Sequence, residues 1–101
     1  MIITGGENVY SKEVEDAIYE HPDVAQAVII GVPHPEWGET VMALVVLHPE
    51  KSMTIEVLRD FLKTRIADYK MPRLLRVLDA LPMNVSGKVL KYKLREQFKD
   101  L

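Results

Sequence analysis

The sequence contains no cysteine among its 101 residues. Disulfide bonds, thiolate metal sites and a cysteine nucleophile are therefore excluded, and the composition suits the reducing cytoplasm in which we expect the protein to work. No apolar run reaches about 18 residues, so we expect no membrane span. The N-terminus lacks the basic region and the long apolar stretch of a signal peptide, so we do not expect one there.

Aromatic residues are few, at 7% of the chain, and they are not interleaved with basic residues. Because binding of single-stranded nucleic acid uses aromatic rings beside cations, no nucleic-acid partner is expected. Bases are also scarce in residues 1–50, which hold one base against nine acids, whereas residues 51–101 hold twelve bases against six acids. Composition alone favours two solvated faces over an anionic partner for the second half, but both interpretations stay open.

Hydrophobic residues make up 48% of the chain, enough for one compact domain with a modest core. Apolar spacing and turn residues predict an extended or hairpin entry at 1–10, helices at 12–20, 55–66 and 90–98, and strands at 25–32, 40–47 and 74–78. Strand 40–47 is apolar nearly throughout, which predicts cover on both faces. The expected fold is α+β: a small three-stranded sheet flanked by about three helices, plus a short N-terminal hairpin.

Ser11 and Thr54 stand immediately before two of these helical patterns, and both are expected to act as N-caps. In the second helix, apolar residues recur at helical spacing and predict one buried stripe. Its expected members are Val57, Leu58, Phe61, Leu62 and Ile66.

His21, His34 and His48 each precede a proline, a pattern typical of turns and helix ends. They lack metal-ligand spacing, so no metal site is predicted. The segment around Lys88 invites comparison with a phosphate-binding P-loop, but that motif needs glycine where Pro82 stands and serine or threonine where Val89 stands. A nucleotide cradle of that type is excluded.

Lys88 nevertheless follows a segment built to turn the chain. Pro82 fixes its φ angle and Gly87 permits backbone angles that β-carbons forbid, so Lys88 should project from a tight loop before a helix. An ammonium held this way can supply charge to a transition state, although most lysines are simply exposed. The pair Gly5-Gly6 is either an ordinary turn or a place where backbone approaches a ligand closely.

Four segments, taken together and in order, resemble the C-terminal domain of acyl-CoA synthetases, members of the adenylate-forming (AMP-binding) superfamily. They are Met1–Glu15, Ile30–Pro33 with Trp37–Glu39, Ala67–Pro72 and Leu81–Lys91. The resemblance covers essentially the whole chain. Within the superfamily, Gly5–Tyr10 is more similar to fatty-acyl and aryl-CoA ligases than to peptide-synthetase domains.

The resemblance implies a two-step reaction. A carboxylate attacks the α-phosphate of ATP to give an acyl-adenylate and pyrophosphate, and the thiol of coenzyme A then displaces AMP. It also implies that 1–101 is one domain, the mobile C-terminal lid, whose partner is its own large N-terminal domain, absent from this sequence. The lid swings between two poses and presents a different face for each step.

Site residues follow from the same resemblance. Lys88 is expected to contact the reacting carboxylate and the nucleotide phosphate. Gly5 and Gly6 are expected to face the pantetheine tunnel, with Tyr69 near the adenine and Arg73 near the 3′-phosphate of coenzyme A. ATP or AMP and coenzyme A then belong to the full-length enzyme, with magnesium bound through ATP and the absent domain, and the fragment itself holds no cofactor.

The expected function is that of a C-terminal fragment of an ATP-dependent, AMP-forming acyl-CoA synthetase, a fatty-acid–CoA ligase, which is inactive alone. Its basic half then has a defined anionic partner, either the acyl-adenylate or coenzyme A. The alternative is a non-enzymatic protein-interaction module that uses the acidic helix 12–20 and the basic helix 90–98. That alternative assigns no role to Lys88.

Overall fold

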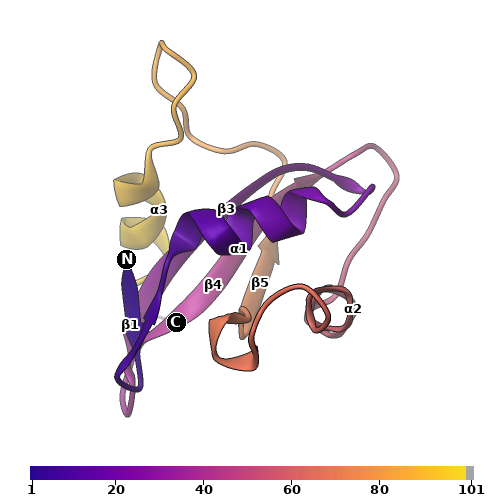
Figure 1. The fold of residues 1–101 in the computed structure, drawn as a ribbon. Coiled ribbons are helices and arrows are strands. Elements are labelled where there is room, and N and C mark those ends of the chain that lie inside the picture. Colours follow the sequence, from indigo (N-terminus) through magenta and orange to yellow (C-terminus); the bar gives the residue numbers. More distant parts are fainter. Residues whose placement is uncertain (100–101) are drawn as a thin grey trace.

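A computed structural model describes residues 1–99 of the chain (Figure 1). The elements, in chain order, are β1 (Ile2–Thr4), β2 (Glu7–Val9), α1 (Ser11–Tyr19), β3 (Val24–His34), β4 (Gly38–Leu47), α2 (Ile55–Leu62), η1 (Asp68–Lys70), β5 (Leu74–Val77) and α3 (Lys91–Phe98). None of the helices within residues 1–99 has both the length and the apolar character needed to cross a bilayer.

Strand β4 is the centre of the sheet. It pairs antiparallel with β3 along one edge and parallel with β5 on the other, from Met42↔Leu74 to Val45↔Val77. The β1–β2 hairpin joins this second edge further along, where Thr4 pairs with Gly38. The predicted α+β fold is confirmed, but the sheet has five strands because the hairpin is continuous with it.

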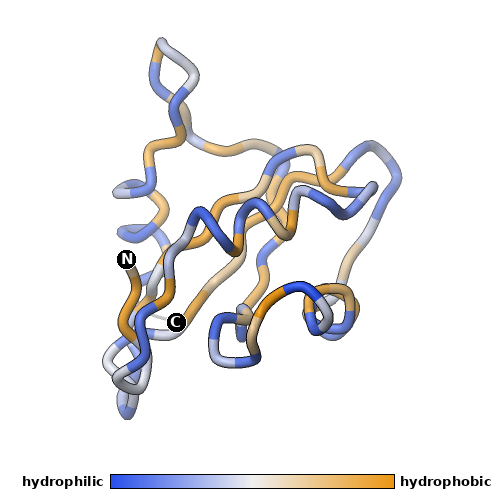
Figure 2. The backbone as a smooth tube through the Cα atoms, viewed as in Figure 1, coloured by the Kyte–Doolittle hydropathy of each residue, from blue (hydrophilic) through white to orange (hydrophobic). Residues whose placement is uncertain are grey.

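The helices cover both faces of the sheet, with α1 and α2 on one side and α3 on the other (Figure 1). Alternate residues of β4 point to opposite sides: Val41, Ala43 and Val45 pack toward α1 and α2, while Met42 and Leu44 pack toward α3. All five are buried, which confirms the prediction that both faces of this strand are covered. The hydrophobic segments of Figure 2 accordingly run through the sheet.

The two expected helix caps have different outcomes. Thr54 does cap α2, because its Oγ1 accepts a hydrogen bond of 3.2 Å from Val57 N. Ser11 does not cap α1. It is the first helical residue, Tyr10 occupies the cap position without a side-chain bond, and Ser11 Oγ instead accepts from Lys91 Nζ at 3.2 Å. The Ser11 hydroxyl therefore bonds to a residue 80 positions away in the sequence and not to the backbone of its own helix.

Two boundaries also differ from prediction. The strands predicted at 25–32 and 40–47 extend further toward each other, because β3 and β4 stay paired as far as His34↔Gly38 and only a short turn separates them. Helix α2 ends at Leu62 rather than near Ile66, and Val57 is 50% exposed instead of lying in the buried stripe. In so short a helix the contact with the sheet is narrow, so only Leu58 and Leu62 are fully buried.

Gly31 in β3 leaves the space that the β1–β2 hairpin needs. A Cβ there would lie 2.5 Å from Glu39 Oε2 and 3.1 Å from Ile2 Cγ2. The Glu39 carboxylate occupies that space and its Oε1 accepts a hydrogen bond of 3.2 Å from Ile3 N, which fixes β1 beside β4.

Substituting Gly31→Ala is therefore expected to destabilise the fold by about 1 kcal/mol, the low end of the range for overpacking, because the flexible Glu39 carboxylate can shift but would then disturb its bond to Ile3 N. Urea unfolding measures this loss. The matched control compares Glu39→Ala with the double variant Gly31→Ala/Glu39→Ala. Both lack the obstructing carboxylate, so the added methyl group should lower the free energy of unfolding much less in this background. An equal cost in both backgrounds would contradict the steric explanation.

Candidate functional sites at opposite ends of the domain

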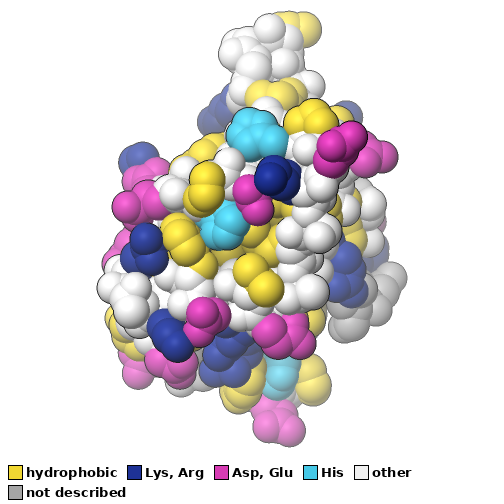
Figure 3. Space-filling model, turned by 90° about the vertical axis from the view of Figure 1, so that its right-hand side faces the viewer, with side chains coloured by type: hydrophobic (Ala, Val, Ile, Leu, Met, Phe, Trp, Pro, Cys, Tyr) yellow, Lys and Arg dark blue, Asp and Glu magenta, His cyan; other side chains and the backbone are white. Residues whose placement is uncertain are grey.

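Lys88 lies on a hairpin that projects from the body of the domain. Its neck is closed by a hydrogen bond of 2.8 Å from Leu90 N to Pro82 O and by an antiparallel bridge between Met83 and Val89. Gly87 turns the chain with a φ of +85°, the region that favours glycine. Figure 1 shows this loop rising above α3, and Figure 3 shows it as a narrow projection from the surface.

The Asn84 side chain fixes the tip of this hairpin. Its Oδ1 accepts hydrogen bonds from Ser86 N at 3.0 Å, Ser86 Oγ at 2.8 Å and Lys88 N at 2.9 Å. Asn84 N donates to Lys88 O at 3.0 Å, so both backbone groups of Lys88 are held by Asn84. Sequence reasoning did not single out Asn84, although an Asn two residues before a Ser-Gly pair is a typical start of such a turn.

The Lys88 amine itself is exposed, and among residues 1–99 no carboxylate forms an ion pair with it. The backbone of Lys88 is held while its charge is free to meet an anion from outside. Lys88 also borders a groove of about 620 Å³ between α1, β3 and α3, whose other cations are Lys91 and Arg95.

The β1–β2 turn forms a second site at the opposite end of the domain (Figure 1). Gly5 and Gly6 are its two central residues, with φ angles of +55° and +84°, as a tight two-residue hairpin requires. Gly5, Tyr69 and Arg73 line one shallow cleft of about 170 Å³, together with Thr4 and Trp37. Gly6 lies beside the cleft with open space around it.

Trp37 organises this cleft and was missed by sequence reasoning. Its ring stacks on His34 with centroids 4.1 Å apart, and the guanidinium carbon of Arg73 lies 4.8 Å from the Trp37 ring centroid. Its backbone oxygen accepts a hydrogen bond of 3.1 Å from Gly5 N. Trp37 is the only tryptophan in the chain and stands in a loop, a signal that pointed to a role beyond packing.

Two neighbouring residues, Lys70 and Met71, anchor the segment that carries Tyr69 and Arg73. Met71 buries its side chain in the core, which leaves Tyr69 and Arg73 at the surface. Lys70 Nζ lies 2.9 Å from Glu13 Oε1 on α1, and the hydrogen bond with Glu13 raises the pKa of Lys70 above its usual value. This ion pair holds η1 against the start of α1 with its charge in place at neutral pH.

Within residues 1–99 no group of three potential metal-ligating side chains comes together. The candidate sites within these residues are thus Lys88, without an ion-pair partner, at one end and a cleft lined by Gly5, Trp37, Tyr69 and Arg73 at the other. The family of AMP-binding enzyme C-terminal domains matches residues 13–88, three quarters of the chain, which include Lys88, Trp37, Tyr69 and Arg73 but not the Gly5-Gly6 turn. The chain belongs to this family.

The relatives of this AMP-binding C-terminal domain are ligases. Feruloyl-CoA synthase of an Amycolatopsis species is 44% identical over 98 residues, which is 97% of this chain and 20% of the relative. A mitochondrial medium-chain acyl-CoA ligase of Rattus norvegicus is 40% identical over 100 residues, which is 99% of this chain and 16% of the relative. The domain therefore spans about a fifth of the length of the relatives it matches.

Solved structures give the same result. The Mycobacterium tuberculosis fatty acyl CoA synthetase superposes with a TM-score of 0.92 at 40% identity, over 99% of this chain and 20% of that one. ATP-bound MatB of Rhodopseudomonas palustris superposes with a TM-score of 0.92 at 42% identity, over 97% of this chain and 20% of that one. The predicted membership of the adenylate-forming superfamily is thereby confirmed.

Proposed function

We propose that residues 1–101 are the mobile C-terminal lid of an ATP-dependent, AMP-forming acyl-CoA synthetase and that Lys88 acts in the adenylation step. The observation that carries this proposal is the state of Lys88: its backbone is held by Asn84 at the tip of a projecting hairpin, yet its amine has no ion-pair partner among residues 1–99. A cation presented in this way fits an anionic site on another domain.

The charge of Lys88 has a definite use in that reaction. A carboxylate and a triphosphate repel each other, and negative charge grows on the oxygens of the α-phosphate as the new bond forms. An ammonium beside both groups offsets the repulsion and the developing charge, most strongly where a closing lid excludes water. Because Lys88 stands on a narrow loop, its single long side chain can enter a tunnel that a forked guanidinium would not fit.

The opposite end of the domain fits coenzyme A. Two glycines without side chains leave room for the thin pantetheine arm to pass against the backbone. Arg73, held beside Trp37, offers a cation to the 3′-phosphate, and the half-exposed Tyr69 ring offers a surface to the adenine. The thiol of coenzyme A, when bound, supplies the nucleophile for the second step.

Lys88 and the Gly5–Arg73 cleft lie at opposite ends of one domain (Figure 1), so they cannot face one active site together. The domain must turn relative to its N-terminal partner between the adenylation and thioester steps. ATP and its magnesium would be held chiefly by that partner, since Lys88 is the cation that this domain presents at the projecting hairpin.

We propose a fatty acid as the substrate, because the relatives include a medium-chain acyl-CoA ligase and a fatty acyl CoA synthetase. The alternative of a non-enzymatic interaction module is not favoured. The acidic α1 and basic α3 that it would use are partly occupied with each other, since Lys91 Nζ lies 2.9 Å from Glu15 Oε2.

The experiment that tests this function compares the isolated 101 residues with the full-length protein. With ATP, magnesium and a series of fatty and aryl acids, the full-length protein should release pyrophosphate and form acyl-CoA, with fatty acids preferred. The isolated domain should release none, because Lys88 then has no bound substrates to act on. Turnover by the isolated domain, or a full-length protein inactive with every acid, would contradict the proposal.

A further inference from the structure

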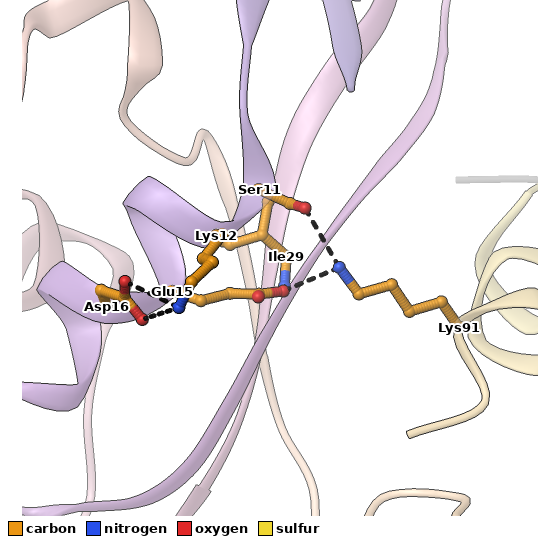
Figure 4. Close-up of polar contacts among 6 residues, drawn as sticks. All are labelled: Ser11, Lys12, Glu15, Asp16, Ile29 and Lys91. Atoms are coloured by element: carbon orange, nitrogen blue, oxygen red, sulfur yellow. Dashed lines mark hydrogen bonds and ion pairs between the residues drawn. The ribbon is translucent and has the colours of Figure 1, made fainter. Parts of the chain in front are cut away.

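Lys91, the first residue of α3, ties the base of the Lys88 hairpin to the rest of the domain. Its Nζ lies 2.9 Å from Glu15 Oε2 and donates to Ser11 Oγ at 3.2 Å, so one amine meets two residues of α1 (Figure 4). Leu90, the residue before it, closes the hairpin neck by bonding to Pro82 O. The attachment therefore acts at the point where the hairpin leaves the body.

Glu15 is itself held in place from a second direction. Its Oε2 accepts a hydrogen bond of 2.8 Å from Ile29 N on β3, the edge strand of the sheet (Figure 4). The Glu15 and Lys91 side chains are only 18% and 28% exposed, so solvent weakens this pair less than it weakens a surface pair. The carboxylate thus links three elements: α1, β3 and α3.

Apolar packing also holds the base of the hairpin, because Leu81 is buried in the cluster beside α3 and Val89 packs against that cluster. Among residues 1–99, few contacts hold the hairpin beyond this base. Helix α3 has no side-chain cap at its start, where Leu90 occupies the cap position. Beyond the neck, the hairpin reaches the body through a weak contact of 3.8 Å from Gln26 Nε2 to Met83 Sδ. At the tip, Val85 is fully exposed. The direction in which Lys88 points therefore depends on this apolar packing and on how the first turn of α3 is held.

We propose that Glu15 and Lys91 are positioning residues that aim the Lys88 hairpin for the adenylation step. This inference rests on the proposed function of Lys88. Neither residue touches substrate. Glu15 fixes Lys91, Lys91 fixes the base of the hairpin, and the hairpin delivers the Lys88 amine. A displacement of about 1 Å at a reacting group can lower a rate a hundredfold. If the base of the hairpin is held less firmly, the Lys88 amine is displaced, and the adenylation step should slow while the thioester step does not.

The test uses full-length enzyme with three variants. Glu15→Gln keeps an oxygen for Ile29 N but loses the charge, Lys91→Met keeps the apolar stem, and the third variant combines both. Each single variant should lower the rate of acyl-adenylate formation about tenfold, with the KM for ATP little changed. The double variant should be no worse than either single one, because both remove the same link. Lys91→Arg should restore most of the rate.

The controls separate positioning from general stability. Lys12→Gln breaks the exposed Lys12–Asp16 pair on the same helix and should leave adenylation unchanged (Figure 4). Formation of acyl-CoA from supplied acyl-AMP should stay normal in the Glu15 and Lys91 variants. Unchanged adenylation in Glu15→Gln and Lys91→Met, or a parallel loss in both steps, would overturn the inference. Lys88→Ala, measured alongside, distinguishes the two proposals: normal adenylation in that variant refutes the proposed function itself.

Discussion

Full-length enzyme carrying Lys88→Ala is expected to form acyl-adenylate about a hundredfold to a thousandfold more slowly than the unmodified enzyme, the usual cost of removing one preorganised group that stabilises transition-state charge. The loss should appear in kcat, because the ammonium is needed most when charge develops on the α-phosphate. Release of pyrophosphate in a single-turnover assay measures it. The second step, acyl-CoA formation from supplied acyl-AMP, should retain most of its rate.

Lys88→Arg is expected to fail almost as badly, because a forked guanidinium does not replace a compact ammonium on a thin hairpin. The matched control is Lys93→Ala, which removes an exposed lysine from α3 without touching the hairpin. It should leave both half-reactions unchanged. Equal losses in the two half-reactions of Lys88→Ala would contradict a lysine specific to adenylation.

Arg73→Gln should affect the other half-reaction. Loss of a charge-assisted hydrogen bond to the 3′-phosphate, worth about 1.5–3 kcal/mol, raises the KM for coenzyme A about tenfold to a hundredfold. The rate of acyl-adenylate formation should not change, because Arg73 shares a cleft with Gly5, and the β1–β2 turn lies at the opposite end of the domain from the projecting hairpin (Figure 1). Steady-state kinetics with varied coenzyme A and saturating ATP and fatty acid measure the effect.

Dephospho-coenzyme A, which lacks the 3′-phosphate, provides the decisive control. Unmodified enzyme should prefer coenzyme A, whereas Arg73→Gln should use the two thiols equally well, because the group that distinguishes them has lost its partner. The matched control is Arg76→Gln, which changes the next exposed arginine in the sequence and should keep the preference for coenzyme A. A persistent preference for coenzyme A in Arg73→Gln would refute the assignment of this arginine to the 3′-phosphate.

Local signals in the sequence were sufficient for the parts of the fold that depend on local physics. The apolar run 40–47 predicted a strand covered on both faces, and β4 is buried on both. Thr54 predicted the start of α2 through its hydroxyl. Pro82 and Gly87 predicted the projecting loop that carries Lys88, because proline and glycine restrict or widen backbone angles wherever they stand.

Long-range partners could not be predicted in this way. Ser11 has the composition of a helix cap, but its hydroxyl bonds to Lys91, which no pattern near Ser11 reveals. Trp37 approaches Gly5 and Arg73 only after β1 and β5 have joined the same edge of β4. The resemblance to a family supplied Gly5, Gly6, Tyr69 and Arg73 as contacts of coenzyme A. The structure brings Gly5, Tyr69 and Arg73 together around the ring of Trp37, a residue that belongs to a resembling segment but was not assigned to the site.

Because β4 lies at the centre of the sheet, it connects most elements of the domain into one body. Strands β1, β3 and β5 are all bonded to it, and helices brace it from above and below. A force applied at the Gly5-Gly6 turn is therefore expected to rotate the sheet and its helices as one body, together with the base from which the Lys88 hairpin projects. For the lid proposed above, cross-linking either end of the domain to the large domain is expected to hold the other end in place as well, and so to block the change from one half-reaction to the next.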